Sequence, residues 1–207
     1  MDGRGSFIVF EGLDGSGKST HIRALCRELL LQGWEVLRTS EPSRGRIGKF
    51  IRAYVEHRER RLPPEIEVLL YAADRFDHLK RVIEPALERG EIVVSDRYVH
   101  SSLAYQGAGG LSIEWIRELN KFALKPDLII LLDVPPETGL GRMRRRRRTV
   151  FEVYPVQQKV RNIYMQLVQK GELMSIDANR PFREVQADVY ESVMNLLEGK
   201  QPPSGKR

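Results

Sequence analysis

The sequence holds a single cysteine, Cys26, and has no apolar run near the roughly 18 residues that a membrane-spanning helix needs. One cysteine excludes an internal disulfide, and its position on the apolar stripe of a predicted helix indicates a packed thiol. The first predicted strand begins at Phe7, which leaves no room for a signal peptide. We therefore predict a cytoplasmic protein that does not enter a membrane.

The sequence is also short of acidic residues, because 34 Lys and Arg stand against 28 Asp and Glu and give a net charge of +6. Six arginines lie within residues 142–148, and without them 28 basic residues equal 28 acidic ones. The excess charge is thus one local patch, whereas a nucleic-acid-binding face is broadly basic. Such a run is either a solvated helix face or a loop that handles phosphate groups. We favour the phosphate loop and expect no nucleic-acid partner.

One stretch near the start of the chain carries a complete nucleotide-binding motif. The apolar segment 7–10 predicts a buried strand, G-x-x-x-x-G-K-S follows from Gly12 to Ser19, and apolar residues then recur at helical spacing. This context separates a P-loop from an incidental glycine-rich turn. Glycines let backbone N–H groups surround phosphate oxygens, while Lys18 reaches the β- and γ-phosphates and Ser19 ligates Mg²⁺. The predicted ligands are ATP and Mg²⁺.

Strands and helices are predicted to alternate along the whole chain. The predicted strands are 7–10, 34–39, 92–95, 128–134 and 173–177, and the main helices between them are 22–29, 47–59, 64–79, 113–119, 156–168 and 182–197. Residues 107–110 are predicted to form a flexible turn, and Ser112 to cap the helix after it. This alternation is typical of a parallel sheet that is covered on both faces. We predict an α/β, P-loop NTPase-type three-layer fold with a five-stranded parallel sheet.

No internal repeat and no second glycine-rich boundary divides the chain. We therefore predict one domain over residues 1–199, with a short arginine-rich lid at about 142–149. Residues 200–207 contain proline and glycine and are predicted to be a disordered tail.

A P-loop identifies the ligand but not the reaction. Asp96 and Arg97 directly follow a buried strand, on the side where such folds bind ligands. Together with the arginine run, they favour phosphoryl transfer between two phosphorylated small molecules, in which arginines neutralise the phosphates and a lid excludes water. The alternatives are an ATPase that binds nucleic acid, and a nucleotide sensor without catalysis. The ATPase is disfavoured because no aromatic residues lie among the arginines of the run. The sensor is disfavoured because a full set of charged residues is present that binding alone does not need: Asp14, Lys18, Asp96, Arg97 and the arginine run.

Several short motifs together make the chain resemble the thymidylate kinases over residues 7–197. The matching segments are Glu11–Thr20, Glu41-Pro42, Ala73–Arg75, Asp96–Tyr98, Ala104–Gly107, Lys125–Leu128, Phe151-Glu152 and Ile176–Ala178. The resemblance implies Mg²⁺-dependent transfer of the γ-phosphoryl group of ATP to dTMP, which gives dTDP and ADP. It also implies a homodimer. Gly15 stands where one subgroup has an arginine, so the chain is similar to the subgroup whose catalytic arginine lies in the lid.

The resemblance also implies roles for individual residues. The catalytic residues that it implies are Asp14, Lys18, Arg97, Arg142 and Arg146. The ATP-binding residues are Gly12, Leu13, Asp14, Gly15, Ser16, Gly17, Lys18, Ser19, Thr20, Asn179 and Arg180. The residues that bind the acceptor are Arg52, Tyr71, Arg75, Arg97, Ser102, Tyr105 and Gln106. The metal-side residues are Ser19 and Asp96.

In this scheme Arg97 bridges the two phosphates, Tyr71 stacks on the thymine ring and Arg75 bonds the base. Tyr105 lies under the deoxyribose and disfavours a 2′-hydroxyl. Both tyrosines have the alternative of being core aromatics, and Arg75 has the alternative of pairing with an acidic neighbour on a helix surface. Asp133, at the end of a strand, is predicted to be structural.

The chain departs from the family pattern around the acceptor. Ser40 replaces an arginine that many relatives have before Glu-Pro, and Ser43-Arg44-Gly45 replaces two glycines and a threonine. Ser102 lies where some relatives have asparagine. These differences keep dUMP and UMP open as alternative acceptors.

Overall fold

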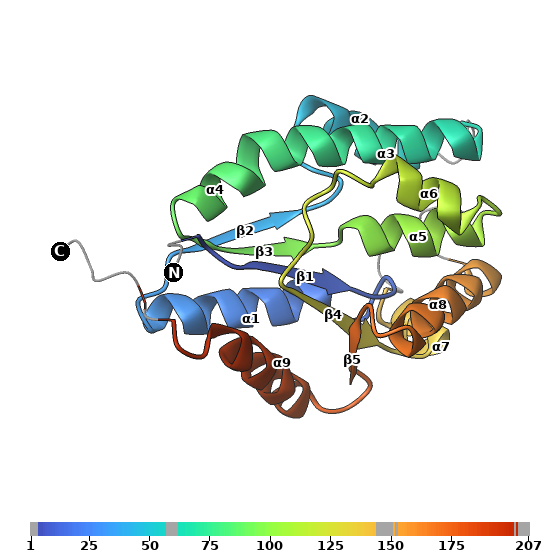
Figure 1. The fold of residues 1–207 in the computed structure, drawn as a ribbon. Helices are drawn as coiled ribbons and strands as arrows, with labels where there is room; N and C mark the ends of the chain where they lie inside the picture. The colour runs from blue at the N-terminus through green and yellow to red at the C-terminus, as the bar shows by residue number, and fades with distance from the viewer. Residues whose placement is uncertain (1–3, 57–61, 144–150, 152, 201, 203–207) are drawn as a thin grey trace.

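The computed structural model describes residues 4–56, 62–143, 151, 153–200 and 202 of the chain. Its centre is a five-stranded sheet of parallel strands in the order β2-β3-β1-β4-β5 (Figure 1). The strands are β1 Phe7–Glu11, β2 Val36–Ser40, β3 Ile92–Asp96, β4 Leu128–Asp133 and β5 Met174–Asp177. The predicted α/β fold with a five-stranded parallel sheet is confirmed.

Helices lie on both faces of the sheet. They are α1 Lys18–Leu31, α2 Arg46–Glu56, α3 Pro64–His78, the π-helical η1 Leu79–Ile83, α4 Glu84–Glu88, α5 Val99–Ala108, α6 Ile113–Leu119, α7 Pro136–Arg142, α8 Tyr154–Gln169 and α9 Phe182–Leu197. In Figure 1, α1 and α9 lie on one face, α3 and α4 lie on the other, and α5 continues beyond the carboxyl end of β3. Because both faces are covered, every residue of β1 is buried, and its sequence shows no alternation of apolar and polar side chains.

The helix α5 was not predicted, and the prediction of a turn over residues 107–110 is partly wrong. Gly107 and Ala108 form the last helical residues of α5, and the chain turns only at Gly109 and Gly110. A Cβ atom on Gly107 would lie 2.6 Å from Cδ1 of Ile113. The lack of a side chain at Gly107 therefore leaves room for the end of the Ile113 side chain, and this glycine packs within α5 and does not mark a flexible link.

Most other predicted elements are present with small shifts in their ends. The strand predicted from residue 34 begins at Val36, and α9 has the bounds that the sequence predicted. The predicted cap is confirmed, because Oγ of Ser112 accepts a hydrogen bond from the backbone N–H of Trp115. Lid residues 144–149, and tail residues 201 and 203–207, lie outside the described part of the chain.

The core confirms two smaller predictions. Cys26 is 7 % exposed within the main apolar cluster, and burial raises the pKa of its thiol to about 11, so it is packed and unreactive. The carboxylate of Asp133 accepts two hydrogen bonds from Arg161, both of 2.8 Å, which is a structural link between β4 and α8. No helix in the described residues is long and apolar enough to span a membrane.

The sheet brings two predicted site segments together. Phe10 of β1 pairs with Asp96 of β3, so the loops after both strands leave the sheet at the same edge. One is the P-loop, residues 12–17, and the other begins with Arg97. In open parallel sheets, ligands bind at this carboxyl edge.

Candidate active site

The P-loop has the tight conformation that its glycines allow. Gly12 has a φ of 140°, and a Cβ atom there would lie 2.5 Å from the carbonyl oxygen of Leu132. Gly15 has a φ of 79°, and its Cβ would lie 2.2 Å from the carbonyl oxygen of Gly139 in α7. Side chains at either position would push the loop away from β4 or α7. The glycines thus keep the loop against the end of the sheet, with the N-terminus of α1 behind it.

Lys18 is buried inside this loop. Its Nζ donates hydrogen bonds to the carbonyl oxygens of Gly12, at 3.0 Å, and Leu13, at 2.9 Å. Burial, aided by the nearby charge of Arg97, lowers the pKa of Lys18 to about 8. The predicted phosphate-binding ammonium group is therefore held at the centre of the loop.

The two predicted metal-side residues lie in contact. Oγ of Ser19 donates a 2.8 Å hydrogen bond to Oδ2 of Asp96. Within the described residues, no cluster of three or more His, Cys, Asp or Glu side chains could hold a metal ion. A lone hydroxyl and carboxylate fit Mg²⁺, which keeps several waters and takes further oxygens from phosphates.

Arg97 connects the P-loop to the acceptor side. Its Nη2 donates to Oδ1 of Asp14 at 2.8 Å and to the hydroxyl of Tyr105 at 3.1 Å, and that hydroxyl donates to Oδ2 of Asp14 at 2.9 Å. The guanidinium carbon lies 4.8 Å from the ring centroid of Tyr105. Burial alone would raise the pKa of Asp14, but the charges of Arg97 and Lys18 outweigh it and lower the pKa. Asp14 is therefore ionised and fixed between the P-loop, Arg97 and Tyr105.

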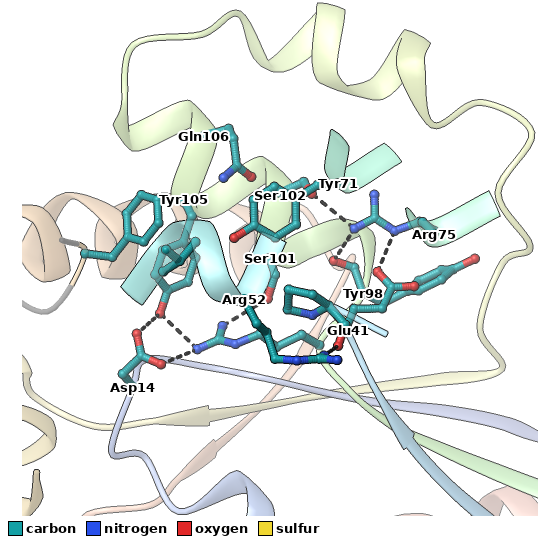
Figure 2. A pocket seen from close by; sticks show the side chains of 14 residues that line it. Asp14, Glu41, Arg52, Tyr71, Arg75, Tyr98, Ser101, Ser102, Tyr105 and Gln106 are labelled. Atoms are coloured by element: carbon teal, nitrogen blue, oxygen red, sulfur yellow. Dashed lines mark hydrogen bonds and ion pairs between the residues drawn. The ribbon is translucent and has the colours of Figure 1, made fainter. Parts of the chain in front are cut away.

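A cavity of about 200 Å³ opens beside this group, and all seven predicted acceptor residues line it (Figure 2). Its lining consists of Asp14, Glu41, Pro42, Arg52, Val55, Tyr71, Arg75, Arg97, Tyr98, Ser101, Ser102, Tyr105, Gln106 and Phe151. In Figure 2, Asp14 and Tyr105 lie at one end and Arg75 at the other. The ring of Tyr105 meets Phe151 edge to face, with centroids 5.7 Å apart. Residues from six separate segments thus converge on one hollow.

Arg75 is not on a helix surface, as one interpretation of the sequence suggested, but is 1 % exposed. Its Nε donates to Glu41 at 2.9 Å, and Nη1 donates to Oδ1 of Asn120 at 2.5 Å. Its Nη2 donates at 3.1 Å to the carbonyl oxygen of Tyr98 and to the hydroxyl of Ser102. These contacts engage all three nitrogens of the guanidinium group, which forms part of the cavity wall.

Sequence reasoning gave no role to Glu41 or Asn120. Glu41 lies in the Glu41-Pro42 segment that matches the family, so its pairing with an arginine could have been predicted from the sequence. Asn120 lies at the end of α6, where its Nδ2 donates to the carbonyl oxygen of Ile116 at 2.8 Å, and no local signal marks it.

The segment from the end of β2 into α2 lines two separate hollows. Arg52 lines the acceptor cavity and donates to the carbonyl oxygen of Pro42, whereas Arg44 and Ser40 line a neighbouring hollow that also reaches Ser19. Ser43 is held by Asp74, which accepts hydrogen bonds of 2.6 Å from both its backbone N–H and its hydroxyl. The serine that departs from the family pattern thus anchors the loop to α3.

The predicted ATP side lies around the P-loop and the end of β5. Arg142 Nη1 donates to the carbonyl oxygen of Gly15 at 3.4 Å, and Nη2 donates to that of Ala178 at 3.3 Å. Asn179 and Arg180 follow directly, and Arg180 pairs with Asp188 of α9. Of the remaining P-loop residues, Leu13 and Ser16 are buried and Thr20 is exposed in the first turn of α1. Arg146 lies outside the described residues.

Comparisons with known proteins identify the family of the chain. The sequence model of the thymidylate kinase family matches residues 10–189. The probable thymidylate kinase of Pyrococcus abyssi is 43 % identical over 203 residues, which cover 95 % of this chain and 99 % of the relative. That of Thermococcus gammatolerans is 40 % identical over 94 % and 99 % of the two chains, and the thymidylate kinase of Halothermothrix orenii is 38 % identical over the same shares. The chain therefore belongs to the thymidylate kinase family.

Proposed function

We propose that this protein transfers the γ-phosphoryl group of ATP to dTMP, giving dTDP and ADP. The observation that carries the proposal is the contact group of Arg97, Asp14 and Tyr105, which joins the P-loop to the acceptor cavity. An arginine at that junction lies where it can bond phosphates from both sides. Transfer between two nucleotides needs an acceptor site next to such an arginine, and the cavity beside Arg97 provides one.

The proposed chemistry is mainly charge neutralisation and positioning. The loop N–H groups and Lys18 hold the donor phosphates, and Arg97 stabilises the charge that the transferred group spreads over its oxygens. Bound Mg²⁺, held on the side of Ser19 and Asp96, would neutralise charge on the donor phosphates. Asp14 orients Arg97 through the 2.8 Å hydrogen bond between them.

The acceptor is proposed to occupy the cavity described above. Tyr71 offers a ring face to the base, while Arg75, Ser102 and Gln106 offer polar groups to its edge. Tyr105 is held by hydrogen bonds on its hydroxyl, so its ring has a fixed position below the sugar. A fixed ring there disfavours an additional 2′-hydroxyl and so favours a deoxyribonucleotide.

The donor side rests on two parts of the chain. We propose that Arg142 and Arg146 of the lid act on the transferred phosphate, and that the backbone at Asn179 and Arg180 holds the adenine. The contacts of Arg142 with the P-loop and with Ala178 support a role at this boundary.

We further propose a homodimer. Phe50 of α2 and Ile66 and Leu69 of α3 are 55 %, 43 % and 47 % exposed, on two helices that pack together. Large apolar groups gathered on neighbouring helices favour burial against a second protein surface. A cytoplasmic location remains a prediction from composition.

The test is ADP formation with ATP and Mg²⁺, with dTMP, dUMP, UMP, CMP, AMP and GMP offered separately and plasmid DNA in a further reaction. We expect turnover with dTMP far above turnover with every other acceptor. A different leading monophosphate would contradict the acceptor assignment but keep the reaction class. Turnover that only DNA stimulates, and that falls steeply with salt, would contradict the kinase proposal altogether.

A further inference from the structure

Glu11, the last residue of β1, is a fully buried carboxylate that the proposed mechanism does not use. It is 0 % exposed and does not line the acceptor cavity. A buried carboxylate is costly unless its oxygens accept hydrogen bonds. Glu11 accepts four, from the backbone N–H groups of Tyr98, at 2.9 Å, and Ser101, at 3.1 Å, and from the hydroxyls of Ser101, at 2.5 Å, and Tyr164, at 2.8 Å. Three of these four donors lie in the segment that follows Arg97.

The backbone of Arg97 is held in an unusual conformation between these contacts. Its φ of 74° is the only positive value at a non-glycine residue in the described chain. The N–H of Arg97 donates to the carbonyl oxygen of Phe10 at 2.8 Å, and its carbonyl oxygen accepts from the hydroxyl of Ser95 at 2.9 Å. The next backbone N–H along the chain, that of Tyr98, donates to Oε1 of Glu11. A left-handed conformation at arginine persists only where its surroundings fix it, and Glu11 is one of the groups that do so.

A second path runs from Glu11 to the guanidinium group itself. The hydroxyl of Ser101 donates to Oε2 of Glu11 at 2.5 Å and accepts from Nη1 of Arg97 at 3.0 Å. Because that hydroxyl has one proton, donating it to Glu11 leaves the oxygen lone pairs free to accept from Arg97. Glu11 thus determines the direction of the Ser101 hydroxyl, and the hydroxyl orients Arg97.

We propose that Glu11 is a positioning residue for Arg97, acting on its backbone through Tyr98 and on its side chain through Ser101. The proposal deepens the proposed function, on which it rests. Burial raises the pKa of Glu11, as expected for a carboxylate kept away from water. Since Glu11 has no exposed surface, any effect that it has on turnover must pass through its neighbours.

The first test is Ser101→Ala, which removes the hydroxyl between Glu11 and Arg97 but keeps both backbone hydrogen bonds to Glu11. We expect kcat to fall about tenfold, with KM for ATP and acceptor within about twofold of the original, because Arg97 acts mainly on the transition state. Ser101→Thr keeps a hydroxyl on the same carbon and is expected to restore most of kcat.

Tyr164→Phe is the matched control. It also removes one hydroxyl from Oε2 of Glu11. The Tyr164 hydroxyl lies 3.2 Å from Oγ of Ser101 as well, but Tyr164 makes no hydrogen bond to Arg97 in the described residues, and Ser101 keeps its own hydrogen bonds to Glu11 and Arg97 in this variant. We expect its kcat to stay within about twofold while its melting temperature falls at least as far as that of Ser101→Ala. Equal losses of kcat in the two variants would mean that Glu11 only supports the fold, and would overturn the proposal.

The second test asks whether Glu11 and Ser101 act by one route. We expect Glu11→Gln to lower kcat by about a hundredfold and Ser101→Ala to add little in that background, because coupled residues are not additive. In an Arg97→Lys background, Ser101→Ala should also add little. Losses that multiply in both backgrounds would refute the route.

A readout without turnover separates this proposal from the proposed function. If the unaltered protein fails to phosphorylate dTMP, the proposed function fails, and the guanidinium resonances of Arg97 in ¹⁵N NMR spectra decide the positioning role. We expect slow rotation and exchange at its Nη groups in the original protein and in Tyr164→Phe. In Ser101→Ala we expect faster rotation at Nη1, which keeps only its 3.2 Å hydrogen bond to the carbonyl oxygen of Gly12. Unchanged resonances in Ser101→Ala would overturn the proposal.

Discussion

Arg75 and Arg97 each pair with a carboxylate, but Arg75 is buried and Arg97 is half-buried, so breaking the two pairs should have different effects. Arg75 contacts Glu41 in the wall of the acceptor cavity, while Arg97 contacts Asp14 at the P-loop. The side chains of the first pair are 1 % and 3 % exposed, and those of the second are 17 % and 24 % exposed. The first pair is thus mainly important for stability, and the second is open to the phosphates of a ligand.

The residues at the phosphates should affect turnover far more than stability. We expect Lys18→Ala and Arg97→Ala each to lower kcat by about three orders of magnitude, because each removes a charge that the transition state needs. Circular dichroism should show a folded domain in both variants. A near-normal rate in either one would contradict the role assigned to that residue.

Breaking the deeper pair should have the opposite balance. We expect Glu41→Ala to lower the free energy of unfolding by about 3–5 kcal/mol, because it leaves the buried charge of Arg75 without its partner. Urea denaturation measures this change. The control is Glu84→Ala, which breaks an exposed pair with Lys80 and should cost less than about 1 kcal/mol. Similar losses in the two variants would show that Arg75 finds another partner.

His100 should make stability depend on pH. Burial lowers its pKa to about 4, although Glu172 lies 3.6 Å from its Nε2. The unfolded chain therefore binds a proton near pH 6.5 that the folded chain does not bind until about pH 4, so stability falls as pH falls through this window. Between pH 7 and pH 5 we expect a loss of about 2 kcal/mol from this residue. His100→Asn should flatten the dependence of unfolding free energy on pH, and an unchanged dependence would contradict the assignment.

At the scale of the element, α6 offers a direct test of capping. The hydroxyl of Ser112 accepts the N–H of Trp115 at 3.2 Å, and Glu114 lies in the first turn. We expect Ser112→Ala to destabilise the protein by about 1 kcal/mol and Ser112→Asn to be nearly neutral, because asparagine caps equally well and its uncharged amide does not repel Glu114, which accepts a 2.8 Å hydrogen bond from the Ser112 hydroxyl. Thermal melting of the three proteins decides it, and equal melting temperatures would show that the cap does not matter here.

The helix that the sequence did not predict explains the limits of local patterns. α5 contains Ser101, Ser102 and Gly107, which are weak helix formers, and it is buried on several sides, so it shows no amphipathic period. Its first turn is capped by Glu11, which lies 90 positions from Ser101. No window of local sequence contains that contact. By contrast, α9 has an ordinary apolar stripe and was predicted with its observed bounds.

The residues of the site also fall into those that local sequence predicts and those that it does not. The P-loop is a local motif, and Asp96 with Arg97 could be predicted because they follow a buried strand in a parallel sheet. The wall around Arg75 could not, since Asn120 lies 45 positions away and carries no motif. Family resemblance supplied the acceptor residues, and the cavity brings them together. The residues that position them became visible only with the packing of α5, α6 and β1.

At the scale of the whole molecule, the exposed apolar groups of α2 and α3 predict association. We expect Leu69→Glu combined with Phe50→Glu to convert a dimer into a folded monomer, because two charges would have to be buried at the interface. Sedimentation velocity measures the mass in solution. The control is Leu31→Glu, at an apolar residue that is 79 % exposed at the end of α1, on the opposite face of the sheet from α3. A monomeric original protein, or a dimeric double variant, would contradict the proposal.

The strand order also has a consequence for solubility. β2 and β5 are the two edges of the sheet, and an open edge can pair with strands of other molecules. β5 has only four residues, and β2 carries an exposed arginine, Arg38, at its middle position. A short edge and a charged edge both disfavour such pairing. Replacement of Arg38 by valine would therefore leave each folded molecule intact and yet favour aggregation while the chain is being made, so that the loss would appear as less soluble enzyme rather than as slower enzyme.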